Sequence, residues 1–258
     1  VPDIPILGLT QAGGRLGLDG SGTPAAGVFS GMLKAIAHEW ESSFVRIVDT
    51  QSEALSEAGA LTVLAQAFQG DVLECGVVSE ARIVSEAQSI NPDKSPDIGP
   101  DDTLIITGGA RGVTAVVARA IAQRFGCRLA LLGRTTVDGI GDLDSLDITA
   151  EKERLKSDLS KEHERVTPAM VRDALKPYLR AVAVRDTLRG IAELGSEVAY
   201  YACDVTDRDS VLEVVGRIRS RFGAIQGVIH GAGVEFSRKL SEKTLDEVAL
   251  TLATKVTG

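Results

Sequence analysis

Residues 103–115 combine a strand-like run with glycines, at a spacing that could hold a nucleotide phosphate. The apolar run Leu104–Thr107 opens onto a glycine pair, and a helical pattern then continues to Phe125. Strand, tight glycine turn and helix together can hold a dinucleotide pyrophosphate, because glycines let backbone N–H groups approach and the helix N-terminus adds partial positive charge. The candidate contacts are Thr107, Gly108, Gly109, Ala110, Arg111, Gly112 and Val113.

The glycine turn alone would fit a structural turn equally well, so the residue after the next predicted strand matters. Arg134 follows the strand-like run Leu129–Leu132, where a doubly wound fold places the adenosine ribose. An acidic residue there would bind the 2′-hydroxyl of NAD, whereas an arginine suits the 2′-phosphate of NADP. Arg111 could add a second cation, and a solvated loop arginine is the alternative interpretation of Arg134.

Two further strand ends carry residues that suit the same ligand. Asp204 and Val205 follow the predicted strand Val198–Ala202, where the carboxylate could accept a hydrogen bond from the adenine amino group. Gly231, Ala232 and Gly233 follow the predicted strand Gln226–His230, and such small residues let the chain lie against a ribose and nicotinamide. Each has an alternative: Asp204 could cap the helix that starts near Asp207, and the glycines could form a bare turn. Together, the four strand ends predict an NADP site.

The elements that position these residues follow an alternating order. Helical patterns lie between the predicted strands and after the last of them, at 112–125, 210–222 and 240–253. Continuous apolar strands alternating with helices predict an α/β fold with a doubly wound parallel sheet. The connection at about 135–195 is far longer than the dozen or so residues that a crossover needs, so we expect an inserted helical subdomain there.

A linker signal divides the chain. Residues 85–102 contain three prolines among polar residues, which neither pack nor propagate a helix, and they separate residues 1–84 from residues 103–258. The first part reads as strand, glycine-rich loop, helix, strand, helix and a final strand pair. We expect its first helix to run from Pro24 to about Trp40, with one face formed by Val28, Met32, Ile36 and Trp40. We expect its second helix to present Leu61, Leu64 and Phe68 on its apolar side.

Composition excludes several classes of protein. The net charge is −8, which argues against a nucleic-acid partner because phosphate backbones select basic surfaces. No apolar run reaches the roughly 18 residues of a membrane span, and no signal peptide is visible. Cys75, Cys127 and Cys203 are widely spaced, so we expect reduced cysteines, no metal site and a cytoplasmic protein.

These motifs resemble those of the short-chain dehydrogenase/reductase superfamily, and more closely the ketoreductase domains of polyketide synthases and multifunctional fatty acid synthases. The carrying segments are 107–112, 132–134, 203–207, 227–234 and 255–258. The long insertion resembles that of polyunsaturated fatty acid synthases. The resemblance implies NADPH-dependent reduction of a β-ketoacyl thioester on acyl carrier protein to the β-hydroxyacyl thioester. It also implies a truncated structural subdomain before the catalytic one, and neighbouring domains of the same synthase as partners.

Only some of the catalytic residues that the resemblance implies are present in this sequence. In that family a Tyr donates the proton, a Lys lowers the pKa of that Tyr, and a Ser holds the carbonyl oxygen. Lys255 with Gly258 matches the family's K-x-x-G pattern, whereas the Ser and Tyr would follow some tens of residues later. Tyr178, Tyr200 and Tyr201 lie in the wrong segments to substitute. We therefore expect these residues to be inactive on their own.

Two other interpretations remain open. A non-catalytic structural or docking domain would explain the missing Ser and Tyr, and also Thr114, which stands where the usual phosphate turn has its third glycine. A stand-alone short-chain reductase is disfavoured by the proline-rich linker and by the degenerate first part. The first helix of that part has no Tyr at its start, so we assign it no cofactor and expect Lys34 and His38 to be surface or packing residues.

Overall fold

The computed structural model describes residues 4–20, 22–51, 56–70, 72–79, 81–86, 97–137 and 145–258. The chain forms two compact units. The first comprises Val1–Lys94 with Phe236–Leu245, and the second comprises Ser95–Glu235 with Asp246–Gly258. The segment Phe236–Leu245 thus belongs to the first unit, although it lies in sequence within the part expected to be catalytic.

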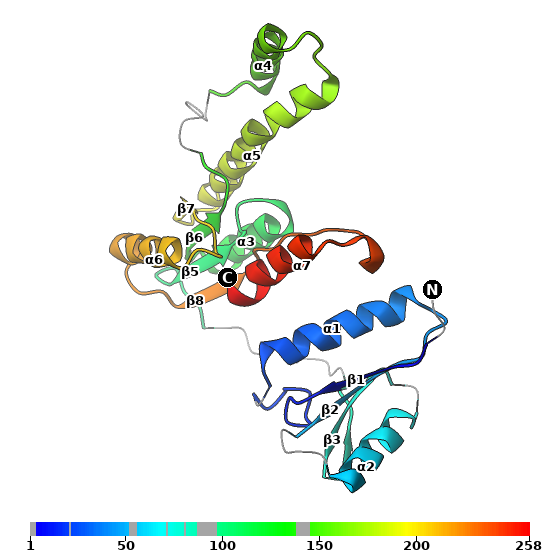
Figure 1. Cartoon of the computed structure of the whole chain (residues 1–258). Coiled ribbons are helices and arrows are strands. Elements are labelled where there is room, and N and C mark those ends of the chain that lie inside the picture. Colours follow the sequence, from blue (N-terminus) through cyan, green and yellow to red (C-terminus); the bar gives the residue numbers. More distant parts are fainter. Residues whose placement is uncertain are drawn as a thin grey trace. The chain divides into compact units, whose positions relative to one another are not determined.

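The first unit is a four-stranded sheet with one helix on each face (Figure 1). The sheet order is β1-β2-β3-β4, in which the first three strands are parallel and β4 returns antiparallel to β3. In chain order the elements are β1 (Ile6–Thr10), α1 (Pro24–Glu39), β2 (Val45–Thr50), α2 (Glu57–Ala67), β3 (Glu74–Val78) and β4 (Ala81–Ile83).

Helix α1 presents only part of the expected face to the sheet, with Ile36 buried as expected, and α2 presents a different one. In α1 the buried apolar residues are Leu33 and Ile36, while Met32 is 43% exposed. A Cβ on Gly8 of β1 would lie 2.1 Å from Leu33 Cδ1, so the missing side chain lets this face of α1 approach the strand closely. In α2 the small residues Val63 and Ala67 are buried, whereas Leu61, Leu64 and Phe68 are exposed.

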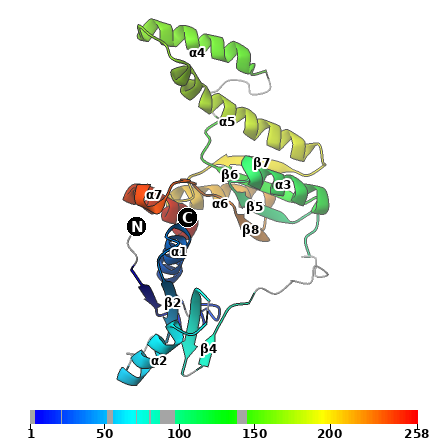
Figure 2. The same cartoon turned by 90° about the vertical axis from the view of Figure 1, so that its right-hand side faces the viewer.

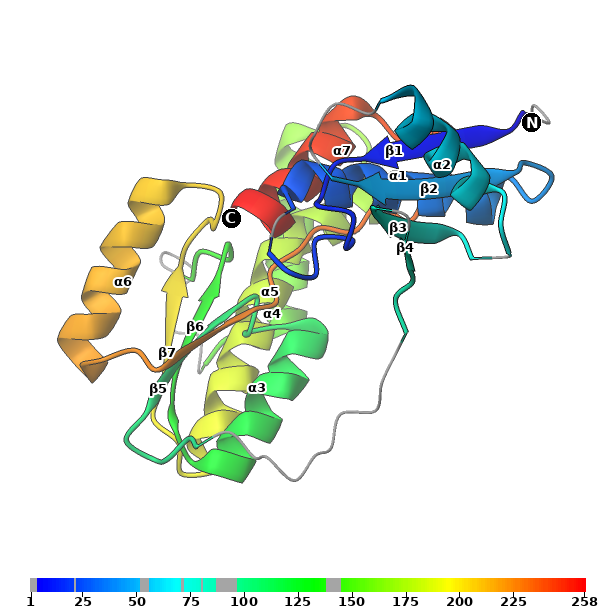
Figure 3. The same ribbon diagram turned by 90° about the horizontal axis from the view of Figure 1, so that it is seen from below.

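The second unit is a fully parallel sheet in the order β7-β6-β5-β8, so the predicted doubly wound α/β fold is confirmed. One face packs against α3 and α5 and the other against α6 (Figure 3). A hydrophobic core lies on each face of the sheet, and alternate residues of β5 point into one or the other. Leu104 and Ile106 face α3, and Ile105 faces α6. The elements are β5 (Thr103–Thr107), α3 (Gly112–Phe125), β6 (Arg128–Gly133), β7 (Val198–Ala202), α6 (Arg208–Phe222) and β8 (Gly227–His230).

The long connection after β6 contains α4 (Ile148–Glu162) and α5 (Pro168–Ala192). The second half of α5 is the crossover helix itself, because its Val184 and Ile191 are buried in the core that it shares with α3 and the sheet. Only α4 and the first half of α5 are surplus, and they form a helical hairpin that projects from the sheet (Figure 2). The inserted part is therefore smaller than residues 135–195.

The predicted helix 240–253 is wrong in its first part. The chain instead forms a 3₁₀ turn η1 (Leu240–Glu242), then α7 (Leu245–Leu252) and a π-helical turn η2 (Ala253–Thr257). Within the first unit, the Leu240 amide donates to Glu39 Oε2 at 2.8 Å, and the Leu240 side chain packs against the α1 core.

Candidate functional site

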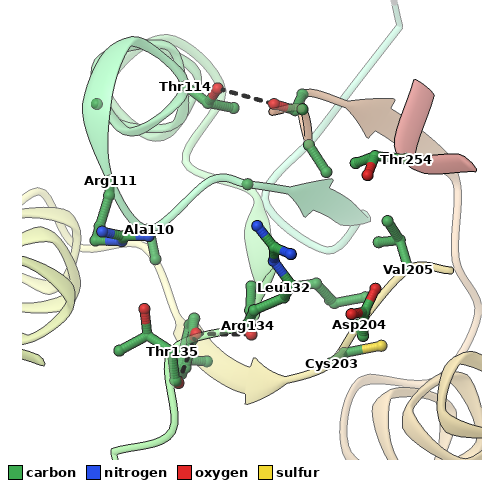
Figure 4. Close-up of a pocket in the computed structure, with 17 residues that line it drawn as sticks. Ala110, Arg111, Thr114, Leu132, Arg134, Thr135, Cys203, Asp204, Val205 and Thr254 are labelled. Carbon is green, nitrogen blue, oxygen red and sulfur yellow. Dashed lines mark hydrogen bonds between the residues drawn. The ribbon is translucent and has the colours of Figure 1, made fainter. Parts of the chain in front are cut away.

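The carboxyl edge of the second sheet contains a cavity of about 350 Å³ (Figure 4). Its walls come from the turn after β5, the strand ends of β6, β7 and β8, and the end of the chain. The residues predicted from the sequence that line it are Gly108, Ala110, Arg111, Gly112, Arg134, Asp204, Val205, Gly231, Ala232 and Gly233. Sequence reasoning missed Thr135, Tyr200, Cys203 and Thr254 as lining residues.

The glycine turn is shaped by two different constraints. Gly108 has a φ of +70°, and a Cβ there would also lie 2.7 Å from the Gly231 carbonyl oxygen, so no other residue fits. Gly112 has a φ of +61° and starts α3 in open space. The residue before it, Arg111, provides no side-chain cap, so the first amides of α3 lie at the cavity without one.

Three of the predicted contacts lie behind or beside the cavity. Gly109 packs against the sheet, where a Cβ would lie 2.9 Å from both Ile106 and Leu131. Thr107 is buried, and its Oγ1 accepts hydrogen bonds from the amides of Gly231 and Ala232, each at 3.1 Å. Val113 projects outward, and the residue is 81% exposed. Thr107 therefore joins two strand ends and does not line the cavity.

Positive charge gathers at one end of the site. Arg111 and Arg134 both line the cavity, and Figure 4 shows the Arg134 side chain directed into it. Burial lowers the pKa of Arg111 most, followed by the like charge of Arg180 on α5 and then of Arg134. Like charges that lower the pKa of Arg111 favour an anionic ligand there, because the ligand relieves the repulsion on that guanidinium group. Sequence reasoning gave no sign of Arg180, since it lies 46 positions beyond Arg134 in the insertion.

Tyr200 supports the loop that carries Arg134. Its hydroxyl lies 2.8 Å from the Gly133 carbonyl oxygen and 2.9 Å from that of Thr135, both of which can only accept. Burial raises the pKa of Tyr200, so the hydroxyl keeps the proton it shares with these carbonyls. Because two carbonyl oxygens hold this hydroxyl, we still expect that Tyr200 does not replace the catalytic Tyr.

Asp204 is an ionised acceptor at the end of β7. Its Oδ1 accepts hydrogen bonds from the Thr206 amide at 3.0 Å and from Thr206 Oγ1 at 2.8 Å. These two bonds hold the pKa of Asp204 below its usual range. The cap of α6 is Asp207, whose carboxylate accepts from the amides of Asp209 and Ser210. The alternative in which Asp204 caps that helix is therefore wrong.

Gly231 and Gly233 make room for protein side chains. A Cβ on Gly231 would lie 2.5 Å from Thr114 Cγ2, and the Thr114 hydroxyl lies 3.5 Å from the Gly231 carbonyl oxygen (Figure 4). A Cβ on Gly233 would lie 3.1 Å from Cε of Lys255. Lys255 thus lies against the rim of the cavity, in the turn η2.

Nothing in the described part of the chain suggests a metal centre, since it contains no group of three or more His, Cys, Asp or Glu side chains that could hold an ion. Cys75, Cys127 and Cys203 are buried and unpaired. In the first unit Lys34 pairs with Glu74 at 2.6 Å, and His38 is exposed. Across the described residues, no helix is long and apolar enough to cross a membrane.

The fold and the cavity at the carboxyl edge of its sheet define an α/β protein of the Rossmann-like type. A model of the KR-domain family matches residues 102–258, more than half of the chain. The chain therefore belongs to the KR family, the ketoreductase domains of polyketide and polyunsaturated fatty acid synthases.

Known relatives are much longer proteins. The chain is 29% identical to one of the polyunsaturated fatty acid synthase polypeptides of Thraustochytrium sp., over 98% of this chain and 10% of the relative. It is 24% identical to polyketide synthase PksL of Bacillus subtilis, over 99% of this chain and 5% of that protein. The chain thus spans a tenth or less of these two relatives, which are parts of large multidomain synthases.

Solved ketoreductases share the fold. A ketoreductase domain from the bacillaene assembly line matches with a TM-score of 0.64 at 18% identity, over 98% of this chain and 49% of that structure. A structure of A-type ketoreductases from a modular polyketide synthase matches with a TM-score of 0.67 at 20% identity, over 98% of this chain and 46% of that structure. At these identities the likeness supports the fold alone.

Proposed function

We propose that the second unit binds NADPH in the cavity of about 350 Å³ and serves the reduction of a β-ketoacyl thioester carried by acyl carrier protein. One observation carries the choice of cofactor: Arg134 follows β6 directly and lies in the cavity with Arg111. An acidic residue at this place would select NAD, whereas paired guanidinium groups suit a 2′-phosphate.

Each part of the cavity then has a role. The turn Gly108–Gly112 and the uncapped start of α3 suit the pyrophosphate, and Asp204 with Val205 suits the adenine. Gly231–Gly233 lies towards the nicotinamide end, with Lys255 against Gly233. Bound there, NADPH would supply the hydride for the ketone carbon. Lys255 would act on the proton that goes to the oxygen, by lowering the pKa of a tyrosine donor.

The catalytic Ser and Tyr of the family have no counterpart among the residues that line this cavity. Tyr200 is the only tyrosine among them, and its hydroxyl is held by two carbonyl oxygens. We therefore expect residues 1–258 to bind NADPH without reducing a ketone by themselves. The carrier protein and the neighbouring domains of a synthase, in the cytoplasm, remain parts of this proposal.

Isothermal titration tests the proposal. NADPH should bind more tightly than NADH, and Arg134→Ala should weaken NADPH binding by about 1–3 kcal/mol, the scale of a charge-assisted hydrogen bond, while leaving NADH binding almost unchanged. Arg219→Ala, which removes an exposed arginine from α6, is the matched control and should change neither. Equal losses for both nucleotides in Arg134→Ala would refute the role of Arg134.

A non-catalytic structural or docking domain remains the second candidate. Thr114 favours it, because its side chain stands where a third glycine would bring α3 closer to the strand ends. If neither nucleotide binds, this candidate replaces the reductase.

A further inference from the structure

His230, at the end of β8, connects the glycine-turn strand to the segment that carries Lys255. Its Nδ1 lies 3.0 Å from Thr107 Oγ1, and its Nε2 lies 3.0 Å from the carbonyl oxygen of Thr254. Thr254 immediately precedes Lys255 in the turn η2. Both ring nitrogens are therefore engaged, each with a different part of the site.

The chemistry of the partners allows only one tautomer. The Thr254 carbonyl oxygen can only accept, so Nε2 must carry the proton that it donates. Thr107 Oγ1 already accepts from the amides of Ala232 and Gly231, the latter shared with the Thr107 carbonyl oxygen. Its own proton remains for His230 Nδ1, which accepts it. The Nε2 end requires a proton on Nε2 and the Nδ1 end requires that Nδ1 carry none, so together they specify a neutral imidazole with its proton on Nε2.

The segment that this imidazole contacts is the turn η2. Thr254 is buried and its hydroxyl bonds back to Leu250, within the same helical segment. Lys255 and Val256 are exposed, and a π-helical turn such as η2 is rare and concentrates at functional sites. The bond from His230 therefore joins the Lys255-bearing turn to the sheet end, which places Lys255 against Gly233.

We propose that His230 is a positioning residue: as a neutral imidazole donating from Nε2, it fixes the turn that carries Lys255 relative to the glycine-turn strand. Its consequence for reduction rests on the proposed function, since it depends on the role of Lys255. The connection itself does not depend on NADPH and can be tested without it.

The first test is the tautomer. The chain has three histidines, so the ¹⁵N resonances of histidine-labelled protein in mildly alkaline buffer are assigned by comparison with His38→Gln and His163→Gln. We expect His230 to show a protonated Nε2 and an unprotonated Nδ1. A protonated Nδ1 in the unsubstituted protein, or an even mixture of tautomers, would overturn the proposal.

The second test uses two variants that each keep one end of the connection. The amide of His230→Gln can place its nitrogen where Nε2 lies and donate to Thr254, whereas His230→Asn reaches only as far as Nδ1. We expect deuterium uptake of the peptide covering Ala253–Thr257 to rise about fivefold in His230→Asn, the factor for one lost hydrogen bond, and to stay near the original in His230→Gln.

Peptides from α6 serve as the internal control, since they should exchange equally in all three proteins. Equal uptake of the Lys255 peptide in both variants would overturn the positioning role, because a residue needed only for folding would not distinguish Gln from Asn. Failure of NADPH to bind the unsubstituted protein would refute the proposed function and leave both of these measurements valid.

Discussion

Gly231→Ala tests whether the glycine after β8 serves protein packing or the ligand. The new Cβ would lie 2.5 Å from Thr114 Cγ2, 2.9 Å from Thr114 Oγ1 and 3.0 Å from the Thr107 carbonyl oxygen. Gly231 is not among the glycines with positive φ, so alanine fits its backbone conformation. Overpacking costs about 1–3 kcal/mol and the stiffer unfolded chain returns about 0.4–1 kcal/mol. We expect a net loss of about 1–2 kcal/mol in the free energy of unfolding.

The second variant removes the side chain responsible. Thr114→Ala deletes the methyl group and the hydroxyl of that side chain. The hydroxyl lies a long 3.5 Å from the Gly231 carbonyl oxygen, so this single variant should leave the free energy of unfolding nearly unchanged. In the double variant the closest remaining contact is the Thr107 carbonyl oxygen at 3.0 Å. Most of the loss should therefore be recovered, which gives a coupling of about 1 kcal/mol or more in a double-mutant cycle.

Urea denaturation of the four proteins measures this cycle. Gly216→Ala on α6 is the matched control, because no heavy atom lies within 4 Å of its added Cβ, and it should stabilise the protein by about 1 kcal/mol. Additivity within about 0.5 kcal/mol would refute the packing argument. A double variant that regains stability but loses NADPH affinity would show that the ligand also needs the glycine.

Three further outcomes follow from the site. Tyr200→Phe should cost about 1–2 kcal/mol of unfolding free energy and weaken NADPH binding, because the Arg134 loop loses its anchor; unchanged affinity in titration would contradict this. Asp204→Asn should lower the free energy of unfolding at neutral pH. The difference in unfolding free energy between this variant and the unsubstituted protein should shrink as pH falls through the lowered folded-state pKa of Asp204. That stability exists above the unfolded pKa and is lost on protonation, so a difference constant down to strong acid in pH-dependent denaturation would refute it. Asp207→Ala removes the cap of α6 and should cost about 1 kcal/mol, measured by thermal unfolding, without changing nucleotide affinity.

Much of the fold could be predicted from the sequence because its signals are local. The apolar runs became β5, β6, β7 and β8 within one or two residues, and the glycines after β5 marked the start of α3. The faces that the helices of the first unit bury were harder to predict from the sequence. Leu33 is buried because Gly8, on a distant strand, leaves space for it, and nothing within α1 itself reveals that.

The sequence likewise predicted one part of the candidate site, and tertiary structure decided the other. The residue types at four strand ends by themselves predicted a nucleotide site, because parallel strands bring their carboxyl ends to one edge wherever they lie in the chain. Only the tertiary structure decided which atoms meet there: Thr114 with Gly231, Tyr200 with the Arg134 loop, and His230 with the Lys255 turn. Such contacts depend on ångström-scale distances between residues far apart in sequence. Spacing along the chain determines the edge of the sheet on which a residue lies, and packing determines its partner.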